Sequence, residues 1–596
     1  MASNLVAVTL SGGLGNQLFQ YAAALALARR HGVRLFLDTS LFRRWSEPRA
    51  FALQPLTRAV PQLARVRLGR DGATAAVIGG ARQQLTVFRE QGFDYDPRFE
   101  QIGPGVLLQG YWQSYRYFDS ISAELGHALK GVAAGLDARN KDLLAEISAK
   151  PSIGVHVRRG DYLVEPYKTP HGVCSLDYYR GNVERLLGEH PGCAAYVFSD
   201  DPAWCRAALG DLGVRVVDHN GPRQAHIDLL LLSACQAHVL SNSSFSWWGA
   251  YLAEKRLRPP VVPIPWFRTR SATPDLFPPQ WEQRSRTTNE PLEVVKERVK
   301  SARVSVVIPA HGRPAMLKEA VASVLQQTKP ASEIIIVLTE ATPECAAAAH
   351  DLASNGIVRV VSTSEPFLSK VRNEGVHAAT GEWIAFLDDD DVWRPQKLEL
   401  QLAAALLLGV GVVSCDFTSF NTSGDISGPG LAKAPAGLSL GQALVLGNFV
   451  SGGSAAIVRA NLFRQVGGFD ESLRASEDVD LWRRLSWHTE IVLLSDKLVR
   501  IRRHEGQMTR NPSLVRLGHR TLFAKMCADT PKELRSMLFP TGLFFWYVGS
   551  RTRLSDLIKT LPDFLADPVL VRKLVGTVMW RAATAPFRRL RKRRPD

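Results

Sequence analysis

The chain has 596 residues, too many for one hydrophobic core, so its length predicts roughly three to four domain-sized units. Hydrophobic residues make up 45% and charged residues 22% of the chain, which is ordinary for a globular protein and excludes a fibrous one. Its seven cysteines form no C-x-x-C pair and no metal-ligand spacing, which argues against a disulfide scaffold and favours reduced thiols in the cytoplasm. We expect no secretory signal, because no basic region followed by a cleavable apolar stretch begins the sequence. We expect no membrane-spanning helix, because no apolar run reaches the roughly 18–20 residues that a span needs.

The first half of the chain predicts alternating strands and helices. Residues 5–10 (LVAVTL) form an apolar run typical of a buried strand, and a glycine-rich turn, a helix over about 17–31 and a strand over 34–37 are expected to follow. The strand pattern returns at 153–157, 195–198 and 214–217, with helical segments between. This alternation predicts parallel α/β sheets.

The glycine-rich turn after the first strand predicts an anion site. Gly12, Gly13 and Gly15 let a ligand approach the backbone at the N-terminus of a helix, where the partial positive charge suits phosphate. Asn16 and Gln17 add hydrogen-bonding side chains at the same place. The alternative is that these glycines only allow a tight turn.

Two arginines, Arg158 and Arg159, directly follow the strand expected at 153–157. Ligands of open α/β sheets bind at the carboxyl ends of the strands, so this pair is placed to bind a pyrophosphate and to neutralise a departing nucleoside diphosphate. We expect Asp161 to pair with one arginine and leave the other free. Farther along, residues 241–246 offer hydroxyl and backbone N–H groups ahead of a double Trp that we expect to pack beneath the loop.

Three motifs stand in this order in the first half: SGGLGNQLFQYA (11–22), HVRRGDY (156–162) and SNSSFSWWGA (241–250). With HGVCSLDYY, FSDDPAWC and DLLLLS between the second and third, they closely resemble glycosyltransferase family 11, the α-1,2-fucosyltransferases, over about residues 5–270. The resemblance implies a GT-B-like two-lobed fold, GDP-fucose as donor, inversion at the fucose anomeric carbon and no metal requirement.

The same resemblance implies that Arg158 holds the β-phosphate of the donor. The other residues expected to bind the donor are Gly13, Gly15, Asn16, Gln17, Arg159, Asn242, Ser243, Ser244 and Phe245. The acceptor hydroxyl needs a general base, and His156, Asp161 and Glu165 are candidates among which the sequence does not choose.

Four consecutive acids, Asp388–Asp391, follow the apolar strand expected at 383–387 in the second half. They repel one another unless a cation is present, and Mg²⁺ or Mn²⁺ prefers carboxylate oxygens together with ligand phosphates. The alternative is a solvated acidic turn. Glu477 and Asp478 begin another expected helix, where an acid pair usually acts as a cap.

Five segments of this half together look like glycosyltransferase family 2 over about residues 303–510: VSVVIPA (304–310), KVRNEG (370–375), ATGEWIAFLDDDD (379–391), GGFD (467–470) and SEDVDLW (476–482). The resemblance implies a GT-A fold, a single inverting displacement, a nucleotide-diphospho-sugar donor and a divalent metal. Asp388 and Asp390 match the D-x-D motif as metal ligands, and Asp478 matches the general base with Glu477 beside it. The donor-binding residues that it implies are Pro309, Glu340, Arg372, Asp388, Asp389 and His504.

One turn departs from the family 2 pattern. The segment LTEAT (338–342) stands where an acidic, glycine-containing turn usually contacts the base and ribose of the donor. Glu340 is the expected substitute, and the identity of the nucleobase is left open.

The end of the chain is basic. Residues 551–596 contain twelve Lys/Arg and four Asp/Glu, a net charge of +8 out of +16 for the chain, and the apolar, aromatic run MLFPTGLFFWYVG (537–549) precedes them. These two features predict attraction to an anionic membrane surface. A solvated tail and packing of the apolar run on a domain surface are the alternatives. No recognised nucleic-acid module accompanies the charge, so we expect no nucleic-acid partner.

The sequence therefore predicts a GT-B-like domain over 1–284, a linker over 285–302, a GT-A domain over 303–509 and a mainly helical basic segment over 510–596. The expected function is a bifunctional glycosyltransferase at the inner face of the cell membrane, acting on a bacterial surface polysaccharide or lipopolysaccharide. Its expected partners are GDP-fucose, a second nucleotide-diphospho-sugar and a glycan or lipid-linked glycan acceptor. The alternative is one active transferase whose other domain is a silent glycan-binding module.

Overall fold

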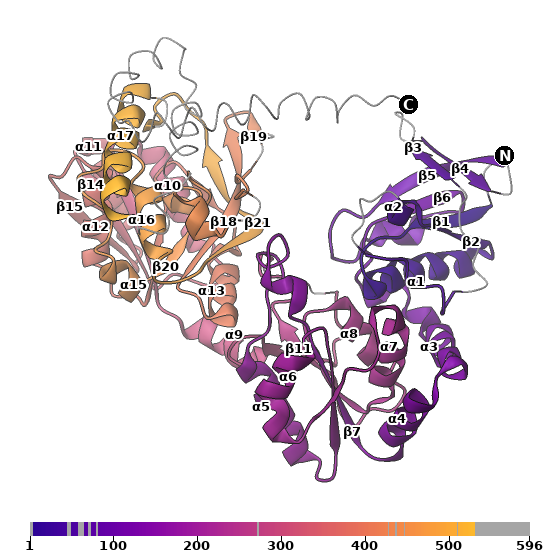
Figure 1. Cartoon of the computed structure of the whole chain (residues 1–596). Coiled ribbons are helices and arrows are strands. Elements are labelled where there is room, and N and C mark those ends of the chain that lie inside the picture. The colour runs from indigo at the N-terminus through magenta and orange to yellow at the C-terminus, as the bar shows by residue number, and fades with distance from the viewer. Residues whose placement is uncertain are drawn as a thin grey trace, which may run out of the picture. The chain divides into compact units, whose positions relative to one another are not determined.

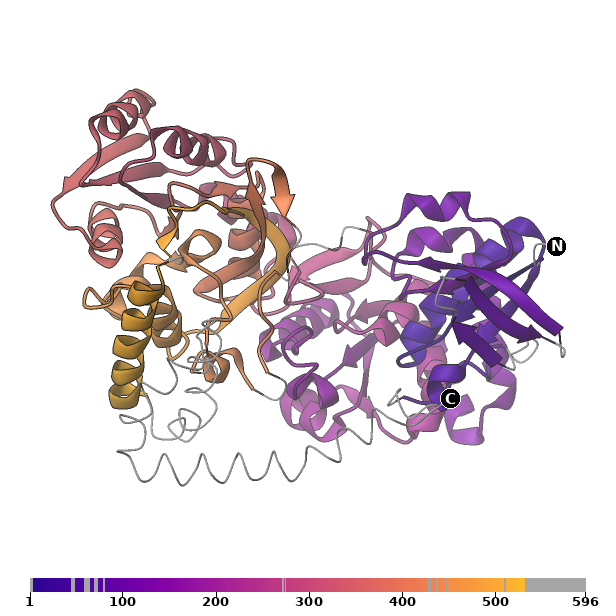
Figure 2. The same cartoon turned by 90° about the horizontal axis from the view of Figure 1, so that it is seen from above.

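The computed structural model describes residues 4–43, 49–57, 65–68, 73–78, 81–270, 273, 275–426, 428, 430–435, 438–445, 447–508 and 511–530. The chain divides into two compact units, Met1–Val295 and Lys296–Asp596, whose elements can be followed by residue number along the colour bar in Figures 1 and 2. The predicted apolar run at 537–549 and the basic segment at 551–596 lie outside the described residues. Within the described ranges, no helix is both long enough and apolar enough to cross a membrane.

The first unit opens with a six-stranded sheet in the order β2-β1-β6-β5-β4-β3. Its elements are β1 (Leu5–Thr9), α1 (Leu14–His31), β2 (Arg34–Asp38), α2 (Ser40–Arg43), β3 (Arg65–Leu68), β4 (Ala73–Ile78), β5 (Ala81–Arg89) and β6 (Val106–Gln109). Strands β1, β2, β5 and β6 run parallel, whereas β3 and β4 add antiparallel strands at one edge. The expected strand, turn, helix and strand at the start of the chain are confirmed.

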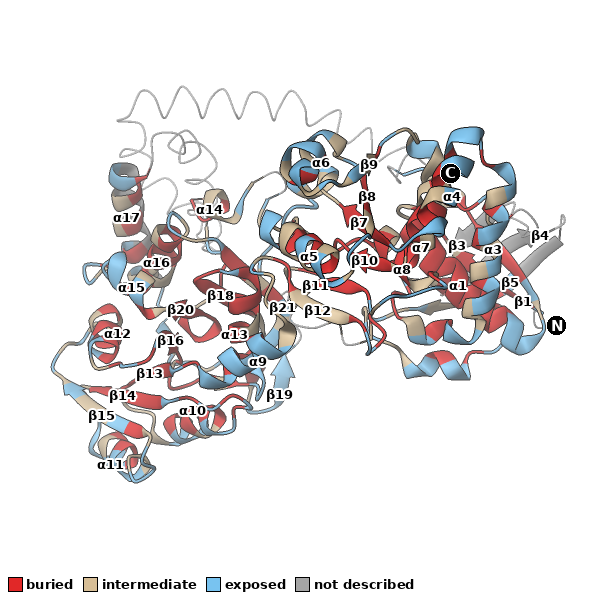
Figure 3. Cartoon of the chain, turned by 90° about the horizontal axis from the view of Figure 1, so that it is seen from below, coloured by how far each residue is buried: buried red, intermediate tan, exposed pale blue. Residues whose placement is uncertain are grey.

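A second six-stranded sheet follows in the same unit, in the order β12-β11-β10-β7-β8-β9, and all its pairings are parallel. The elements are α3 (Ser122–Lys130), α4 (Ala138–Ala149), β7 (Ser152–Val157), α5 (Leu176–Glu189), β8 (Ala194–Ser199), α6 (Pro202–Leu209), β9 (Arg215–Val217), α7 (Ala225–Ala234), β10 (Ala237–Val239), α8 (Ser244–Tyr251), β11 (Val261–Ile264) and β12 (Glu282–Ser285). Every residue of β7, β10 and β11 is buried, as Figure 3 shows in red, which is typical of the central strands of a parallel sheet that is covered on both faces.

The two sheets of the first unit meet where α1 crosses α8. A Cβ atom at Gly15 would lie 2.4 Å from the backbone N of Phe245, and the indole Nε1 of Trp248 donates to the carbonyl of Gly15 at 3.0 Å. The ring centroid of Phe19 lies 4.6 Å from that of Trp247. The double Trp therefore packs beneath the 241–246 loop, as expected, and the contact brings the first and third motifs together.

The second unit is built on one nine-stranded mixed sheet in the order β15-β14-β13-β16-β20-β18-β21-β17, with β19 paired to β18. Its strands are β13 (Val304–Ala310), β14 (Glu333–Thr339), β15 (Val358–Thr363), β16 (Trp383–Phe386), β17 (Val392–Trp393), β18 (Val412–Asn421), β19 (Gly424–Ile426), β20 (Ile457–Arg459) and β21 (Ile491–Arg502). Strands β13 to β16 pair in parallel, and β20 joins β16 antiparallel. The α/β class predicted from the sequence is confirmed in both units.

Helices surround this sheet. They are α10 (Pro314–Leu325), α11 (Pro343–Leu352), α12 (Leu368–His377), α13 (Lys397–Leu408), α14 (Leu440–Ala443), α15 (Ala460–Gln465), α16 (Glu477–Leu485) and α17 (Pro512–Asp529). Helix α17 begins beyond residue 509, the expected end of this domain, and shares a buried core with it through Leu522 and Met526. The expected linker at 285–302 contains a helix, α9 (Leu292–Ser301), which the polar sequence did not suggest.

Two glycines of the first motif are predicted to differ in what they tolerate. Gly15→Ala should destabilise the first unit by about 1–3 kcal/mol or more, because the new methyl group would meet backbone atoms that have no room to move. Gly13→Ala should leave stability unchanged, because Gly13 has an extended backbone (φ −76°) and a Cβ there meets nothing within 4 Å. Denaturant unfolding of both full-length variants checks this, and equal stability for the two would contradict the packing of α1 on α8.

Candidate active sites

Arg158 lies just past the carboxyl end of β7, in the first unit. Its guanidinium donates to the Asp161 carboxylate at 2.6 Å and pairs with the Asp200 carboxylate at 3.1 Å, and it lies 5.5 Å from the centre of the Tyr162 ring. The side chain is 21% exposed, so its cationic head still reaches solvent. Asp161 and Asp200 therefore orient the partly exposed guanidinium of Arg158 at the carboxyl edge of a parallel sheet, where ligands of such sheets bind.

Arg159 is also held by an acid. Its Nε pairs with the Asp201 carboxylate at 3.1 Å, and its guanidinium stacks 4.2 Å from the Trp204 ring centre. The expectation that Asp161 would leave the second arginine free is therefore wrong. The reason is the pairing of β7 with β8, which places the two acids that follow β8 next to the two arginines that follow β7.

The three candidate bases of the first unit all have partners. The Nδ1 atom of His156 lies 2.7 Å from the Ser241 hydroxyl, and burial lowers the pKa of His156 to about 3, so the ring is neutral at physiological pH. Asp161 binds Arg158 and also Arg49. Glu165 accepts a hydrogen bond from the Thr169 hydroxyl at 2.5 Å. His156 thus links the second and third motifs, and the geometry does not single out one base.

Several polar side chains expected to meet the donor in this unit hold the loops instead. The Gln17 amide donates to the carbonyls of Gly12 (2.8 Å) and Ala50 (2.9 Å) and accepts from the N–H of Ala52 (2.9 Å), while its side chain is fully buried. Asn242 donates to the carbonyl of His171 at 3.1 Å. The remaining contacts among these residues are Asn16 with Gln113 (2.9 Å), Ser243 with the N–H of Phe245 (3.4 Å), and Ser244 and Phe245 with Gly15.

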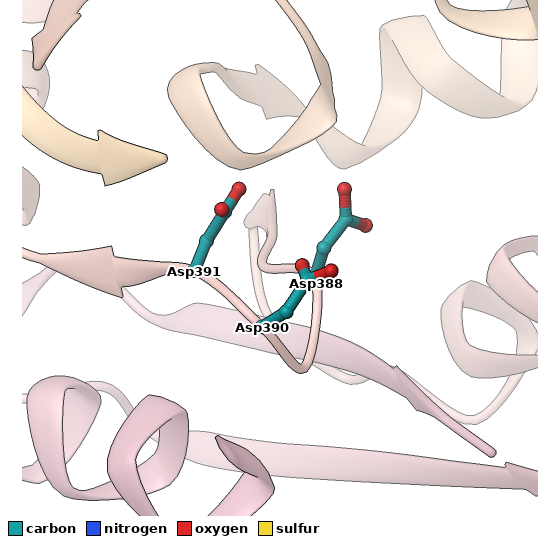
Figure 4. A group of neighbouring side chains, drawn as sticks. All are labelled: Asp388, Asp390 and Asp391. Atoms are coloured by element: carbon teal, nitrogen blue, oxygen red, sulfur yellow. The ribbon is translucent and has the colours of Figure 1, made fainter. Parts of the chain in front are cut away.

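The acidic run of the second unit follows β16 and forms a compact cluster. One carboxylate oxygen each of Asp388, Asp390 and Asp391 lies within 4.8 Å of the others, and the three side chains project from one turn toward the same side (Figure 4). Burial, followed by the charges of Asp388 and Asp390, raises the pKa of Asp391 well above its usual range. An all-oxygen, acid-rich donor set of this kind fits a hard divalent cation. The sequence identified Asp388 and Asp390 but not Asp391.

Asp389 has a different environment from the cluster. Its side chain is 3% exposed and pairs with Arg313 at 2.9 Å, and burial raises its pKa to about 6. Arg313 also donates to Asp390, and the Nε2 atom of His504 lies 2.8 Å from the same carboxylate. Arg313 was missed at the sequence level, because an arginine in the turn after β13 carries no motif that links it to acids 76 and 77 residues away.

A buried arginine joins the acidic cluster to α16. Arg372, on α12, is 2% exposed and donates to the Asp388 carboxylate at 2.6 Å and to the Glu477 carboxylate at 2.8 Å. Burial alone would lower the pKa of Arg372, but the two carboxylates outweigh it and the pKa is raised. This residue was expected to bind the donor, and its guanidinium instead donates hydrogen bonds to two protein carboxylates.

Asp478 lies in the first turn of α16 and borders a cavity of about 1130 Å³. Its Oδ2 atom lies 3.5 Å from the Asn448 amide, and its Oδ1 accepts from the N–H of Val479 at 2.8 Å. Burial, and then the neighbouring Glu477, raise the pKa of Asp478 to about 7, whereas Arg372 lowers it. The N-cap of α16 is Ser476, so neither acid of the pair stands at the cap position.

The cavity collects most of the residues expected in the second site. Its lining includes Pro309, Glu340, Arg372, the four acids Asp388–Asp391, Glu477 and Asp478, while His504 contacts it through Asp390. Three residues other than glycine that line it have left-handed backbone conformations: Glu340 (φ 42°), Ser451 (φ 78°) and Ser476 (φ 65°). Such conformations are unfavourable and gather at functional sites, which makes this cavity the candidate active site of the second unit.

Comparisons with known proteins match the two halves separately. The family model for glycosyl transferase family 11 matches residues 98–259, and the model for glycosyl transferase family 2 matches residues 305–467. An alpha-1,2-colitosyltransferase of Escherichia coli is 30% identical over 290 residues, which cover 47% of this chain and 98% of that protein.

Two further relatives have similar coverage. The O-antigen biosynthesis glycosyltransferase WbnK of Escherichia coli is 28% identical over 285 residues, covering 43% of this chain and 93% of that protein. The galactoside 2-alpha-L-fucosyltransferase SEC1 of Bos taurus is 27% identical over 255 residues, covering 41% of this chain and 64% of that protein. Each of these alignments accounts for less than half of the chain.

The acidic cluster predicts that a divalent cation will stabilise the folded protein and that Asp391 is one of its ligands. Saturating Mn²⁺ should raise the unfolding temperature of the full-length protein, because binding to the native state alone adds about 2.7 kcal/mol at a hundred times the dissociation constant. Asp391→Asn should lose most of this shift. The control is Asp425→Asn, an exposed acid of β19, which should keep the shift. Calorimetry measures the unfolding temperature with and without Mn²⁺. If Asp391→Asn keeps the full rise in unfolding temperature, Asp391 is not a ligand of the cation.

Proposed function

We propose that this chain, which belongs to glycosyltransferase family 11 through its first half and to glycosyltransferase family 2 through its second, is a bifunctional enzyme with one sugar transfer in each unit. The observation that carries the proposal is that each unit has its own means of handling a diphosphate. The first offers an arginine oriented by carboxylates, and the second offers an acidic cluster that shares a cavity with Asp478. A chain with one catalytically silent unit would have no need for both the oriented arginine and the acidic cluster.

The proposed first transfer moves fucose from GDP-fucose to the 2-hydroxyl of a galactoside, with inversion and without a metal. The two sheets of the first unit would form the two lobes of a GT-B-like fold, with Arg158 at the carboxyl edge of the second sheet. As the bond to fucose breaks, negative charge develops on the departing GDP, and Arg158 is placed to stabilise it. Asp161 and Asp200 hold its guanidinium in position before the donor arrives.

A second candidate donor for this unit is the corresponding colitosyl nucleotide. The relative with 30% identity is named as an alpha-1,2-colitosyltransferase, whereas the bovine relative is named as a fucosyltransferase. Colitose is fucose without the 3-hydroxyl group, so the two donors present the same diphosphate to Arg158. Turnover with each nucleotide sugar on the same acceptor decides between them.

The proposed second transfer is an inverting displacement in the GT-A-like unit, with Mg²⁺ or Mn²⁺ as cofactor. Asp388, Asp390 and Asp391 would hold the metal, which when bound offsets the negative charge of the donor diphosphate. Asp478 takes the proton from the acceptor hydroxyl, and its raised pKa suits a base that works near neutral pH. Glu477 and Arg372 tie this base to the acidic cluster.

We place the two transfers in the synthesis of a bacterial surface glycan. The support is the name of WbnK, an O-antigen biosynthesis enzyme, together with the basic sequence at 551–596, which favours a peripheral position on an anionic membrane. The experiment that tests the bifunctional assignment is a donor screen on the full-length enzyme with GDP-, UDP- and dTDP-sugars. Variants that silence one unit at a time assign each activity to its unit.

Arg158→Ala is predicted to lower the first transfer by about 10²–10³-fold, since the lost interaction forms with a charge that develops in the transition state. The second transfer in the same protein should be unchanged. The control, Arg206→Ala, removes a surface arginine of α6 that pairs with Asp218 and should leave both rates as they are. Initial rates with each donor provide the measurement, and a normal first transfer in Arg158→Ala would refute the assigned role.

Asp478→Asn is predicted to lower the turnover of the second transfer by about 10²–10⁴-fold while donor binding survives, because a base acts when the acceptor proton leaves. In the wild type, the same rate should rise as the pH increases through about 7, as the carboxyl of Asp478 loses its proton. Asp351→Asn, an exposed acid of α11, serves as the control. Donor titration and single-turnover rates are compared, and weak donor binding with normal turnover of the bound complex would make Asp478 a structural residue.

A further inference from the structure

Helix α17 packs so closely on the segment before α16 that one position admits only glycine. A Cβ atom at Gly518 would lie 2.6 Å from both the Cβ and the carbonyl oxygen of Ala475. Farther along α17, Leu522 and Met526 are buried in one cluster with Leu473 and Val479. The helix therefore contacts both the turn that leads into α16 and the first turn of α16 itself.

Buried charges lock the same two helices together. Asp480 is fully buried and bonds to Arg483 (2.9 Å), Arg484 (2.7 Å) and Lys525 (3.0 Å). Arg483 is fully buried as well, and it also pairs with Asp529 at 2.8 Å. Lys525 and Asp529 both come from α17. Because buried ions need partners with good geometry, this network allows little sliding of one helix along the other.

The part of α16 held in this way carries the chemistry of the second site. Asp478 lies three residues beyond Ala475 and two residues before Asp480. Ser476, which stands between Ala475 and Asp478, has a left-handed backbone at φ 65°. One turn from the start of α17, Val515 lines the same cavity as Asp478. A shift of α17 would thus move one wall of the cavity and the carboxylate together.

We infer that α17 is a positioning element of the second active site: Gly518 and Lys525 fix the first turn of α16 so that Asp478 faces the acceptor hydroxyl. This inference rests on the proposed second transfer and adds to it a helix outside the range expected for the catalytic domain. Neither residue touches substrate, and both act through the placement of Asp478.

The first test is Gly518→Ala in the full-length enzyme. We expect about a 10²-fold loss in the turnover of the second transfer, because small misplacements of a catalytic group have effects of this size. Affinity for the second donor and the first transfer should stay at the wild-type level, and retained binding of the second donor reports that the second unit is folded. The matched control is Leu517→Ala, since Leu517 is the preceding residue and is 53% exposed. Turnover of Gly518→Ala equal to that of Leu517→Ala would overturn the inference.

The second test separates positioning from general loosening. Lys525→Met removes the cation between Asp470 and Asp480, and Lys525→Arg restores one. We expect turnover to fall in Lys525→Met and to recover at least in part in Lys525→Arg, with the unfolding temperature measured for both. Equal turnover in the two variants would overturn the role of Lys525, whatever their stability.

The pH profile gives a readout that a purely structural role would not move. Burial raises the pKa of Asp478, and Glu477 beside it and Asp388 from the acidic cluster raise it further. Arg372 from α12 and the N–H of Val479 lower this pKa. A shift of α16 that exposes Asp478 lowers its pKa, so the acidic limb of the rate profile should move to lower pH in Gly518→Ala. An unchanged limb with reduced turnover would contradict the proposed displacement. Absence of any second transfer in the wild type would instead refute the proposed function.

Discussion

The guanidinium of Arg372 is the charge on which the second site depends. Two carboxylates from distant segments, Asp388 after β16 and Glu477 at the start of α16, are brought together by one buried cation. Removing one partner of such a buried group typically costs about 3–5 kcal/mol, because the remaining charge is left uncompensated. Arg372 therefore sets the spacing between the acidic cluster and Asp478, which is the spacing between a bound diphosphate and the acceptor in the proposed reaction.

The two units solve the same electrostatic problem with opposite charges. In the first unit, carboxylates after β8 hold an arginine that would face the diphosphate directly. In the second unit, Arg313 and Arg372 hold the carboxylates of Asp390 and Asp388, which would face it through a divalent cation. Strand order brings the partners together in the first unit and brings Arg313 to the acidic run in the second, because parallel neighbouring strands end at the same edge. Burial of the carboxyls themselves raises the pKa values of Asp389, Asp391 and Asp478 in the second unit.

The sequence predicted the strands and the motifs well because these are local signals. Continuous apolar runs such as 153–157 gave β7, and the order of motifs predicted two transferase halves, which the family matches confirm. Contacts across long separations were not predicted. Arg313 meets Asp390, and Asp201 meets Arg159, only because of sheet order, and no spacing rule in the sequence encodes that order. Gln17 was expected to face a ligand because side-chain amides often do. Its amide instead forms hydrogen bonds with backbone groups of Gly12, Ala50 and Ala52.

The different charge solutions also make the two proposed transfers respond differently to their surroundings. An arginine keeps its charge at any physiological pH, so in the proposed first transfer Arg158 would face a diphosphate without an added ion. The proposed second transfer would depend on a divalent cation and on the Asp478 carboxyl, whose pKa is raised to about 7. If both proposed transfers operate, a fall in free cation would slow the second more than the first. The two units of one chain would then add their sugars in a ratio that depends on the cation supply, because only the second unit places a carboxylate cluster between the protein and the diphosphate.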